Sequence, residues 1–311
     1  MLGRCFLILM AAVATGCAAK ARPAAAPAPP RAYSGLETIG ELKTFEESLG
    51  GHPTENFLRV SDRPAADERC YFTGKLQLPE FYSGLRMARE DEEHCTGRTA
   101  DNDVFFYRIQ AVASGDETIT AALADAPAER VLMVVPHEDF HNQAEARKAP
   151  TEVAESAATL VGFLTASAFA KATLGETSPT YQGLDRDIGL FLKKSLVVNV
   201  YYDKLSALYA DFRSGLLTPE QTLHAKAALF AELEQSCSEI SPDPVSFNKC
   251  PAALNNAGLA FDRTYTRNYP MMYSLYELLG ADTATLVSTL KRLMTRWPAE
   301  ATDARQLIEA R

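Results

Sequence analysis

The chain has few histidines and no excess of positive charge. Among its 311 residues only five are histidine, and the acidic side chains outnumber the basic ones, 40 to 31, which gives a net charge of −9. Because proteins that bind nucleic acid neutralise phosphates with lysine and arginine, this balance argues against a nucleic-acid partner. The chain also has no internal repeat and no C-x-x-C pair, which argues against a repeat array and against a zinc site built from cysteines.

Cysteines are scarce as well. Two of the six lie in the first seventeen residues, and the other four are Cys70, Cys95, Cys237 and Cys250. An even number of cysteines in an exported protein suggests disulfides, and four cysteines allow three pairings. We favour Cys70–Cys95 and Cys237–Cys250, because each pair brackets a polar connection. Free buried thiols are the alternative.

The N-terminus has the features of an export signal. Residues 1–16 combine a basic start at Arg4 with a short apolar stretch and small residues at 14–16, so they predict a signal peptide. Small residues followed by Cys17 resemble a bacterial lipobox, in which Cys17 is lipidated, and Ala18 after it is typical of an outer-membrane destination. We therefore expect a lipid anchor on the periplasmic side. Ordinary cleavage to a soluble secreted product is the alternative.

The segment after Cys17 predicts a tether followed by one domain. Residues 17–33 are rich in alanine and proline and read as an extended linker, so residues 34–311 would form a single helical domain. No later apolar stretch is long and unbroken enough to predict a helix that crosses a bilayer.

Helical periodicity dominates that domain. Helices are expected at 36–49, 185–212, 282–294 and 299–308, and Thr218 with Gln221 forms the signature of a helix start. Strand-like runs are few, at 69–75, 104–112 and 130–135. The predicted class is mainly α with a minor β contribution.

Residues 137–141 read H-E-x-x-H, the motif of helix-borne zinc sites. On a helix, His137 and His141 leave the same face about one turn apart and can reach one ion. Glu138 projects about 100° round the helix from His137, where it can accept a proton from water. The other histidines, His52, His94 and His224, read as surface or packing residues.

A catalytic zinc site needs a third protein ligand, and the next histidine after His141 is His224. A histidine ligand six residues after the motif is thus excluded, and a glutamate remains. Pro150 would turn the chain, with Thr151 as the cap of a second helix. On that helix Glu155 shares a face with small residues that permit close approach, so Glu155 is the predicted ligand. Glu152 lies in the first turn of that predicted helix, where a carboxylate interacts favourably with the helix dipole.

The lead-in to the motif is apolar and β-branched. Arg130–Val135 therefore predicts a buried strand, and Pro136 predicts the first position of the zinc helix. His137 would then lie in the first turn, where the helix dipole favours the neutral imidazole.

Three stretches in order resemble a family of predicted zinc aminopeptidases from bacterial envelopes. They are Pro136–Gln143, Ala154–Gly162 and Leu254–Leu259, and the similarity extends over about residues 36–297. The resemblance implies a zincin-like helical domain, with the H-E-x-x-H helix beside a second helix that bears the ligand Glu155. It also implies Zn²⁺ as the cofactor and a peptide as the substrate.

This resemblance implies metal-assisted peptide hydrolysis, with Glu138 as the base. Tyr265 and Tyr269, near the third stretch, are candidates for stabilising the oxyanion, and Tyr201 and Tyr202 are further possibilities. Asn255 and Asn256 are candidates for binding the substrate backbone; capping a helix is the alternative. An aminopeptidase also needs a carboxylate for the substrate ammonium, and Glu152, Asp139 and Asp262 are available.

Two other functions remain open from the sequence. The site could hold a structural zinc or bind peptide without catalysis in an envelope lipoprotein. The same site could also serve an endopeptidase. Glu138 favours an enzyme over a structural site, because a closed zinc site has no use for a base.

Overall fold

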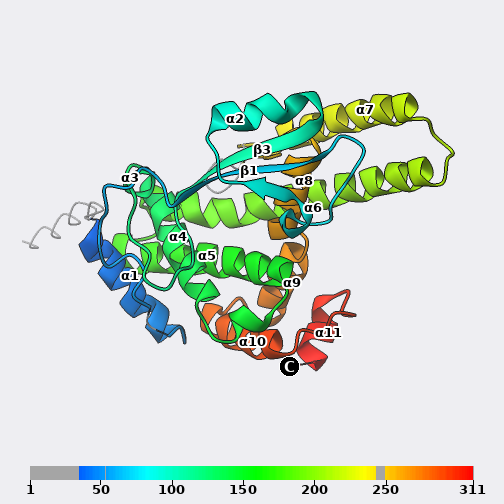
Figure 1. The fold of residues 1–311 in the computed structure, drawn as a ribbon. Helices are drawn as coiled ribbons and strands as arrows, with labels where there is room; N and C mark the ends of the chain where they lie inside the picture. Colours follow the sequence, from blue (N-terminus) through cyan, green and yellow to red (C-terminus); the bar gives the residue numbers. More distant parts are fainter. Residues whose placement is uncertain (1–34, 53, 243–248, 311) are drawn as a thin grey trace, which may run out of the picture. The chain divides into compact units, whose positions relative to one another are not determined.

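The fold is mainly α-helical, with a three-stranded antiparallel sheet in the order β2–β1–β3 (Figure 1). The computed structural model describes residues 35–52, 54–242 and 249–310. The predicted signal peptide, the tether and Cys17 lie outside the described residues. The strands are β1 (Asp67–Gly74), β2 (Arg86–Ala88) and β3 (Asn102–Ile109). The helices are α1 (Leu36–Ser48), α2 (Glu92–Gly97), α3 (Ala121–Ala124), α4 (Ala128–His141), α5 (Thr151–Leu174), α6 (Pro179–Arg213), α7 (Pro219–Ser238), α8 (Asn256–Thr266), α9 (Tyr269–Leu278), α10 (Thr283–Thr295) and α11 (Ala304–Glu309), with the 3₁₀ turns η1 (Tyr82–Gly84), η2 (Arg98–Ala100) and η3 (Ala146–Lys148).

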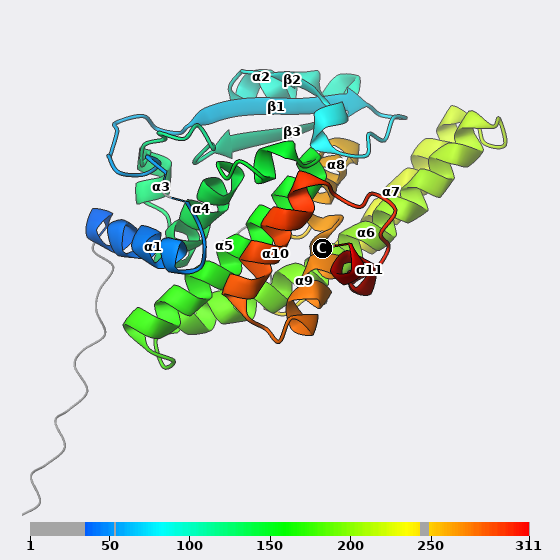
Figure 2. The same ribbon diagram turned by 90° about the horizontal axis from the view of Figure 1, so that it is seen from below.

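The two helices that carry the predicted ligands lie at the centre of the fold. α4 packs along α5, and α5 also contacts α6, α8, α9 and α10 (Figures 1 and 2). α5 is long and apolar enough to cross a membrane by composition, contrary to the expectation from sequence. However, 94% of its most apolar window is buried inside the fold, which is typical of a core helix.

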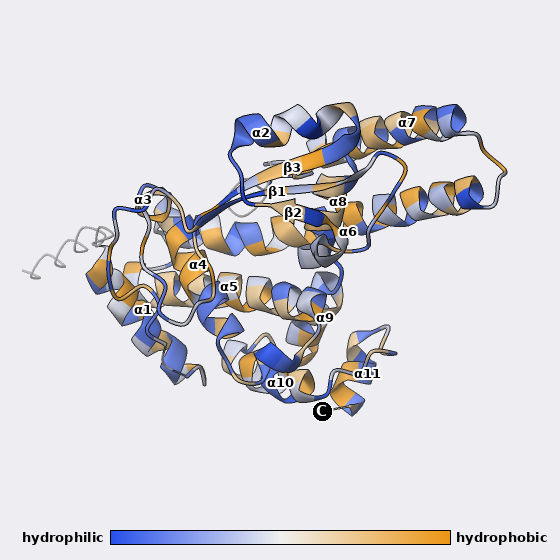
Figure 3. Ribbon diagram, viewed as in Figure 1, coloured by the Kyte–Doolittle hydropathy of each residue, from blue (hydrophilic) through white to orange (hydrophobic). Residues whose placement is uncertain are grey.

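The sheet packs on this helical layer through α8. Phe105 of β3 lies 4.6 Å from Phe261 of α8, measured between ring centroids, and Tyr71 of β1 lies 5.5 Å from the same ring. β3 is apolar in its middle part (Figure 3), as expected of a strand that rests on a core. The predicted strands at 69–75 and 104–112 are thus β1 and β3.

The structure confirms the helix start that the sequence predicts from the capping residues Thr218 and Gln221. α7 begins with the predicted capping box between Thr218 and Gln221, and α10 begins after Asp282, whose side chain accepts from the Thr285 N–H. α6 extends the predicted 185–212 helix back to Pro179, since Ser178 caps it. The helix expected at 299–308 begins only at Ala304, after the Asp303 cap.

The strand predicted at 130–135 was wrong. Those residues form the middle of α4, which starts at Ala128 and runs through Pro136 to His141. Val131 to Val135 are all buried, so the run shows no polar face, and a fully buried helix cannot be told from a strand by periodicity. Pro136 lies inside the helix, where its missing N–H removes one backbone hydrogen bond.

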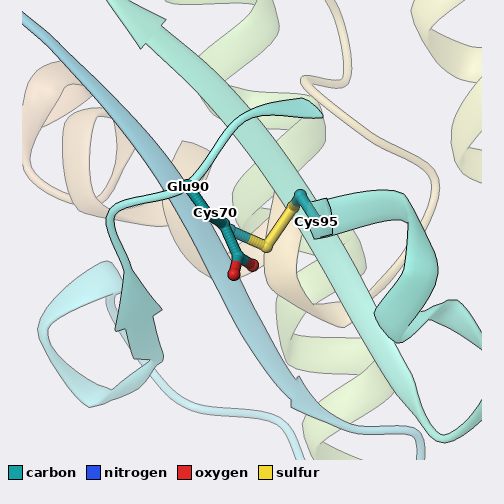
Figure 4. Close-up of side chains that lie close together, drawn as sticks. All are labelled: Cys70, Glu90 and Cys95. Carbon is teal, nitrogen blue, oxygen red and sulfur yellow. A yellow bond between two sulfur atoms is a disulfide. The ribbon is translucent and has the colours of Figure 1, made fainter. Parts of the chain in front are cut away.

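Both predicted disulfides are present. Cys70 is bonded to Cys95, and Cys237 to Cys250. The first ties β1 to α2, and Glu90 lies next to it (Figure 4). Although Glu90 and these cysteines are close enough to resemble a metal site, the sulfurs are bonded to each other and Glu90 binds Arg98.

Candidate active site

A glycine contact sets the distance between the two ligand-bearing helices. A Cβ added to Gly162 of α5 would lie 2.8 Å from the backbone oxygen of Met133 and 3.2 Å from Cβ of His137. The helices therefore approach at a spacing that no larger residue at 162 would allow without a shift. This contact supports the expectation that small residues on α5 let it approach the H-E-x-x-H helix.

The close approach brings the three predicted ligands together. Nε2 of His137 and Nε2 of His141 are 3.3 Å apart, and Oε2 of Glu155 lies 3.4 Å from the first and 3.1 Å from the second. Ligands placed tetrahedrally at about 2.0–2.1 Å from a zinc ion lie about 3.3 Å from one another. The three donor atoms thus form a nearly equilateral triangle of the size that one small divalent cation requires.

The turn that reverses the chain also differs in detail from the prediction. Pro150 occupies the cap position of α5, and Thr151 is the first residue of the helix. No side chain makes a capping hydrogen bond there. Thr159 donates to the backbone oxygen of Glu155 at 2.8 Å, so its hydroxyl does not orient the carboxylate. Glu152 lies in the first turn of α5, as expected.

A residue that the sequence did not indicate orients Glu155. The hydroxyl of Tyr82, in η1, donates to Oε1 of Glu155 at 3.0 Å, while Oε2 faces the histidines. Each carboxylate oxygen therefore has its own set of partners. The two residues are 73 positions apart, and no local pattern around Tyr82 connects them.

The position of His137 and His141 on α4 corrects the argument from the helix dipole. His137 lies in the third turn of α4 and His141 is its last residue, so neither is at the N-terminal end.

The ligands shift the pKa values of one another. Burial disfavours the charged form of His141, but the Glu155 carboxylate outweighs the effect of burial and raises the pKa of His141. For Glu155, burial likewise opposes charge, yet the two imidazoles hold the pKa of its carboxyl well below the usual range. The carboxylate of Glu155 thus stays ionised.

Glu138 points into the same cleft from the position beside the histidines. It is half-buried, and burial raises the pKa of its carboxyl group. A carboxylate with a raised pKa accepts a proton more readily than an exposed one. Glu138 thus lies beside the two histidines in the cleft, where its carboxyl group can accept a proton.

The opposite side of α4 is anchored by a buried polar network. Asp139 accepts hydrogen bonds from Thr54 at 2.5 Å and Asn56 at 2.8 Å, and it pairs with Lys43 of α1. Gln143 is bonded to the backbone of His52 in both directions. These contacts fix the rotation of α4, which determines where the two imidazoles point.

The site opens into a cleft of about 300 Å³ between the helices and the sheet. α4, α5 and α8 form one wall, and β1, β3 and the segment after β3 form the other. Among the described residues, the lining comprises Arg69, Tyr71, Tyr82, Tyr107, Ile109, Gln110, Ala111, Val112, Ala113, Arg130, Val134, His137, Glu138, His141, Glu155, Phe261 and Tyr265.

Of the predicted tyrosines, the structure brings Tyr265 to the site and places Tyr269 elsewhere. Tyr265 lines the cleft, and its ring centroid lies 6.4 Å from that of His137 at an interplanar angle of 26°. Burial raises the pKa of Tyr265, so the phenol keeps its proton. Tyr269 is fully buried against Phe191 and donates to the backbone oxygen of Ile188 at 3.3 Å. Tyr269 therefore packs in the core and does not reach the cleft.

The other two tyrosine candidates also lie outside the cleft. The Tyr201 hydroxyl is bonded to Ser236 at 2.9 Å, and Tyr202 stacks against the guanidinium of Arg263. Both belong to the apolar cluster between α6 and α7.

The two asparagines stabilise the fold and do not line the cleft. Asn255 caps α8, accepting from the Gly258 N–H at 3.0 Å, and its side chain donates to the backbone oxygen of Val104. Asn256 is fully buried and donates to the backbone oxygen of Gln77 and to the Tyr209 hydroxyl. The capping alternative thus describes Asn255, and both residues join α8 to the sheet side of the fold.

The three carboxylates considered for an ammonium site do not line the cleft either. Asp139 belongs to the network behind α4. Asp262 is paired with Lys194, and both of these side chains are fully buried. Glu152 is on the first turn of α5. The remaining histidines, His52, His94 and His224, are exposed, as expected.

Fold and site together define a mainly helical protein in which two histidines and one glutamate can hold a metal ion beside a cleft. The chain belongs to the family described as "Putative aminopeptidase", whose model matches residues 89–305. Membership of this family supports a peptidase. No curated protein and no solved structure shows significant similarity to the chain.

Proposed function

We propose that this protein is a zinc-dependent peptidase, and that it removes residues from the N-terminus of peptides. The observation that carries the proposal is the triangle of Nε2 of His137, Nε2 of His141 and Oε2 of Glu155, with sides of 3.1 to 3.4 Å. Two imidazoles and a carboxylate are the donor set of many catalytic zinc sites, which leave the fourth position for water or substrate. Zinc bound there would act as a Lewis acid, which activates water and polarises the peptide carbonyl.

The residues of the chain supply the proton transfers. Glu138 accepts a proton from the attacking water as the oxygen of that water bonds to the carbonyl carbon. When the C–N bond breaks, Glu138 returns this proton to the leaving amine. Tyr265, a protonated phenol that lines the cleft, would donate a hydrogen bond to the oxyanion. Tyr82 keeps Glu155 in position through its hydrogen bond to Oε1.

A variant of the base tests the proposal. Glu138→Gln keeps the size of the side chain and removes its basicity, so we expect it to bind zinc like the wild type. Its turnover of fluorogenic peptides should fall by about 10²-fold or more. Matched peptides with free and acetylated N-termini test the aminopeptidase assignment. Equal activity of Glu138→Gln and the wild type would refute the mechanism, and faster cleavage of the acetylated peptides would indicate an endopeptidase.

We also propose that the protein works in the bacterial envelope, anchored to the outer membrane through a lipid on Cys17. The signal-like residues 1–16 and the alanine- and proline-rich 17–33 motivate this location, with residues 34–311 as the catalytic domain. The two disulfides support it, since disulfides persist in oxidising compartments. Cell fractionation tests it: Cys17→Ala should move the protein from the membrane to the soluble fraction, and membrane retention of that variant would refute the anchor.

A further inference from the structure

The charge of the cleft is unusual for an enzyme whose substrate brings a free ammonium group. Among the described lining residues the only carboxylates are Glu138 and Glu155, and both already have roles in the proposed reaction. The same lining contains two guanidinium groups, those of Arg69 and Arg130. The cleft thus presents fixed positive charge to the part of the substrate that lies away from the reacting bond.

The sheet directs Arg69 into the cleft. Arg69 and Tyr71 are two residues apart on β1 and share one face of the sheet. Tyr107 of β3 lies directly opposite Arg69 in the antiparallel register, so it belongs to the same face. All three line the cleft. This face of the sheet is therefore one wall of the binding site.

Arg69 is held in place and keeps donors for a ligand. Its Nε donates to Asp67 at 2.7 Å, and its Nη1 donates to the Tyr71 hydroxyl at 3.4 Å. A guanidinium has five N–H groups in a fixed fork, so within the described structure three of them remain for another partner. Asp67 also pairs with Arg89 at 3.2 Å, so one carboxylate is shared between two guanidinium groups and leaves net positive charge.

Arg130 lies on α4 at a defined distance from the metal ligands. It precedes His137 by seven residues, which is two helical turns or about 10 Å along the axis. Its Nε donates to the Gln110 side chain at 2.8 Å, across the cleft. An extended peptide advances about 3.3 Å per residue, so this distance corresponds to about three residues. A volume of about 300 Å³ is at the small end of ligand pockets, which favours a short peptide.

We propose that the cleft selects short peptides that carry a carboxylate within about three residues of the bond to be cleaved, and that Arg69 and Arg130 bind this carboxylate. The carboxylate is either the free C-terminus of the peptide or an acidic side chain. Guanidinium forks match carboxylates in shape and charge, which would place the substrate relative to Glu138. This inference rests on the proposed peptidase function.

The experiment uses the full chain loaded with zinc and two pairs of peptides. Ala-Ala-Ala as the free acid is compared with Ala-Ala-Ala amide, and Ala-Asp-Ala amide with Ala-Asn-Ala amide. Hydrogen bonds to charged groups predict that the carboxylate-bearing member of at least one pair has a kcat/KM about tenfold higher or more. The pair that shows the preference identifies the source of the carboxylate. Equal kcat/KM values within both pairs would overturn the proposal.

Variants then assign the preference to the two arginines. Arg69→Gln and Arg130→Gln should each reduce it at least severalfold, mainly through KM, while Arg69→Lys should retain part of it because the charge remains. Arg86→Gln is the matched control, since Arg86 pairs with Phe72 in the register and lies on the other face of the sheet. A preference that survives in both Arg69→Gln and Arg130→Gln would overturn the proposal.

A binding measurement separates this inference from the proposed function. If the zinc-loaded wild type hydrolyses none of the peptides, the peptidase proposal fails. Calorimetry with the same pairs then still decides the specificity. Tighter binding of the carboxylate-bearing peptides, weakened by Arg69→Gln, would support the carboxylate site, and equal binding would overturn it.

Discussion

The hydroxyl of Tyr82 donates a hydrogen bond to Oε1 of Glu155, while Oε2 of the same carboxylate faces the two imidazoles. Partners of this kind orient metal ligands and raise affinity for the ion. Tyr82→Phe should therefore weaken zinc binding by about tenfold or more, measured by competition with a chelator of known affinity. Tyr273→Phe, far from the cleft on α9, is the control and should leave the affinity unchanged. An unchanged affinity in Tyr82→Phe would contradict the orienting role.

The contact between Gly162 and Met133 predicts opposite effects for two glycine-to-alanine changes. In Gly162→Ala the new methyl group would meet the Met133 oxygen, so the helices must separate, and the free energy of unfolding should fall by about 1–3 kcal/mol. Gly189 lies within α6 with nothing near its Cβ position, so Gly189→Ala should raise the free energy of unfolding by about 0.5–1 kcal/mol. Urea denaturation measures both values. Equal effects would refute the close-approach argument.

The buried pair of Lys194 and Asp262 predicts that the variant Lys194→Met becomes more stable as the pH falls. Both side chains are fully buried and lie 2.7 Å apart, and burial raises the pKa of Asp262 even in the pair. Lys194→Met leaves a buried carboxyl without its cation, which should cost about 3–5 kcal/mol at neutral pH.

The sign of the pH effect follows from proton binding. A raised pKa means that the folded Lys194→Met protein binds a proton at Asp262 at a pH where the unfolded chain does not. Its stability should thus increase as the pH falls from 7 towards the pKa of the unfolded carboxyl, as measured by urea denaturation at several pH values. Adding Asp262→Asn should remove this rise. Stability of Lys194→Met that does not increase towards low pH would contradict the argument.

Much of the candidate metal site could be predicted because it is encoded locally. Four residues of helix place His137 and His141 on one face, and Pro150 forces the chain to turn before Glu155. The small residues of α5 then indicate which face meets α4. Each step depends on residues close in the sequence, so helix geometry, the proline turn and the small residues of one helix face are sufficient together.

The remaining features depend on contacts between distant residues. The run 130–135 predicts a strand although it is helical, because complete burial removes the polar positions that would reveal a helix. Arg69 of β1 and Tyr82 of η1 reach the site from segments that both contact α8, and the sequence around them has no metal-site pattern. The sequence suggests Asn255 and Asn256 as substrate-binding residues, but their side chains join α8 to neighbouring segments.

The zinc content of two matched glutamate variants tests the proposed metal site most directly. Glu155 and Glu152 lie on the same helix, but only Glu155 faces the histidines. Elemental analysis of the purified full chain should find one zinc ion per molecule in the wild type and in Glu152→Ala, and a large loss in Glu155→Ala. Full zinc occupancy in Glu155→Ala, or a wild type that binds no zinc, would contradict the proposed site.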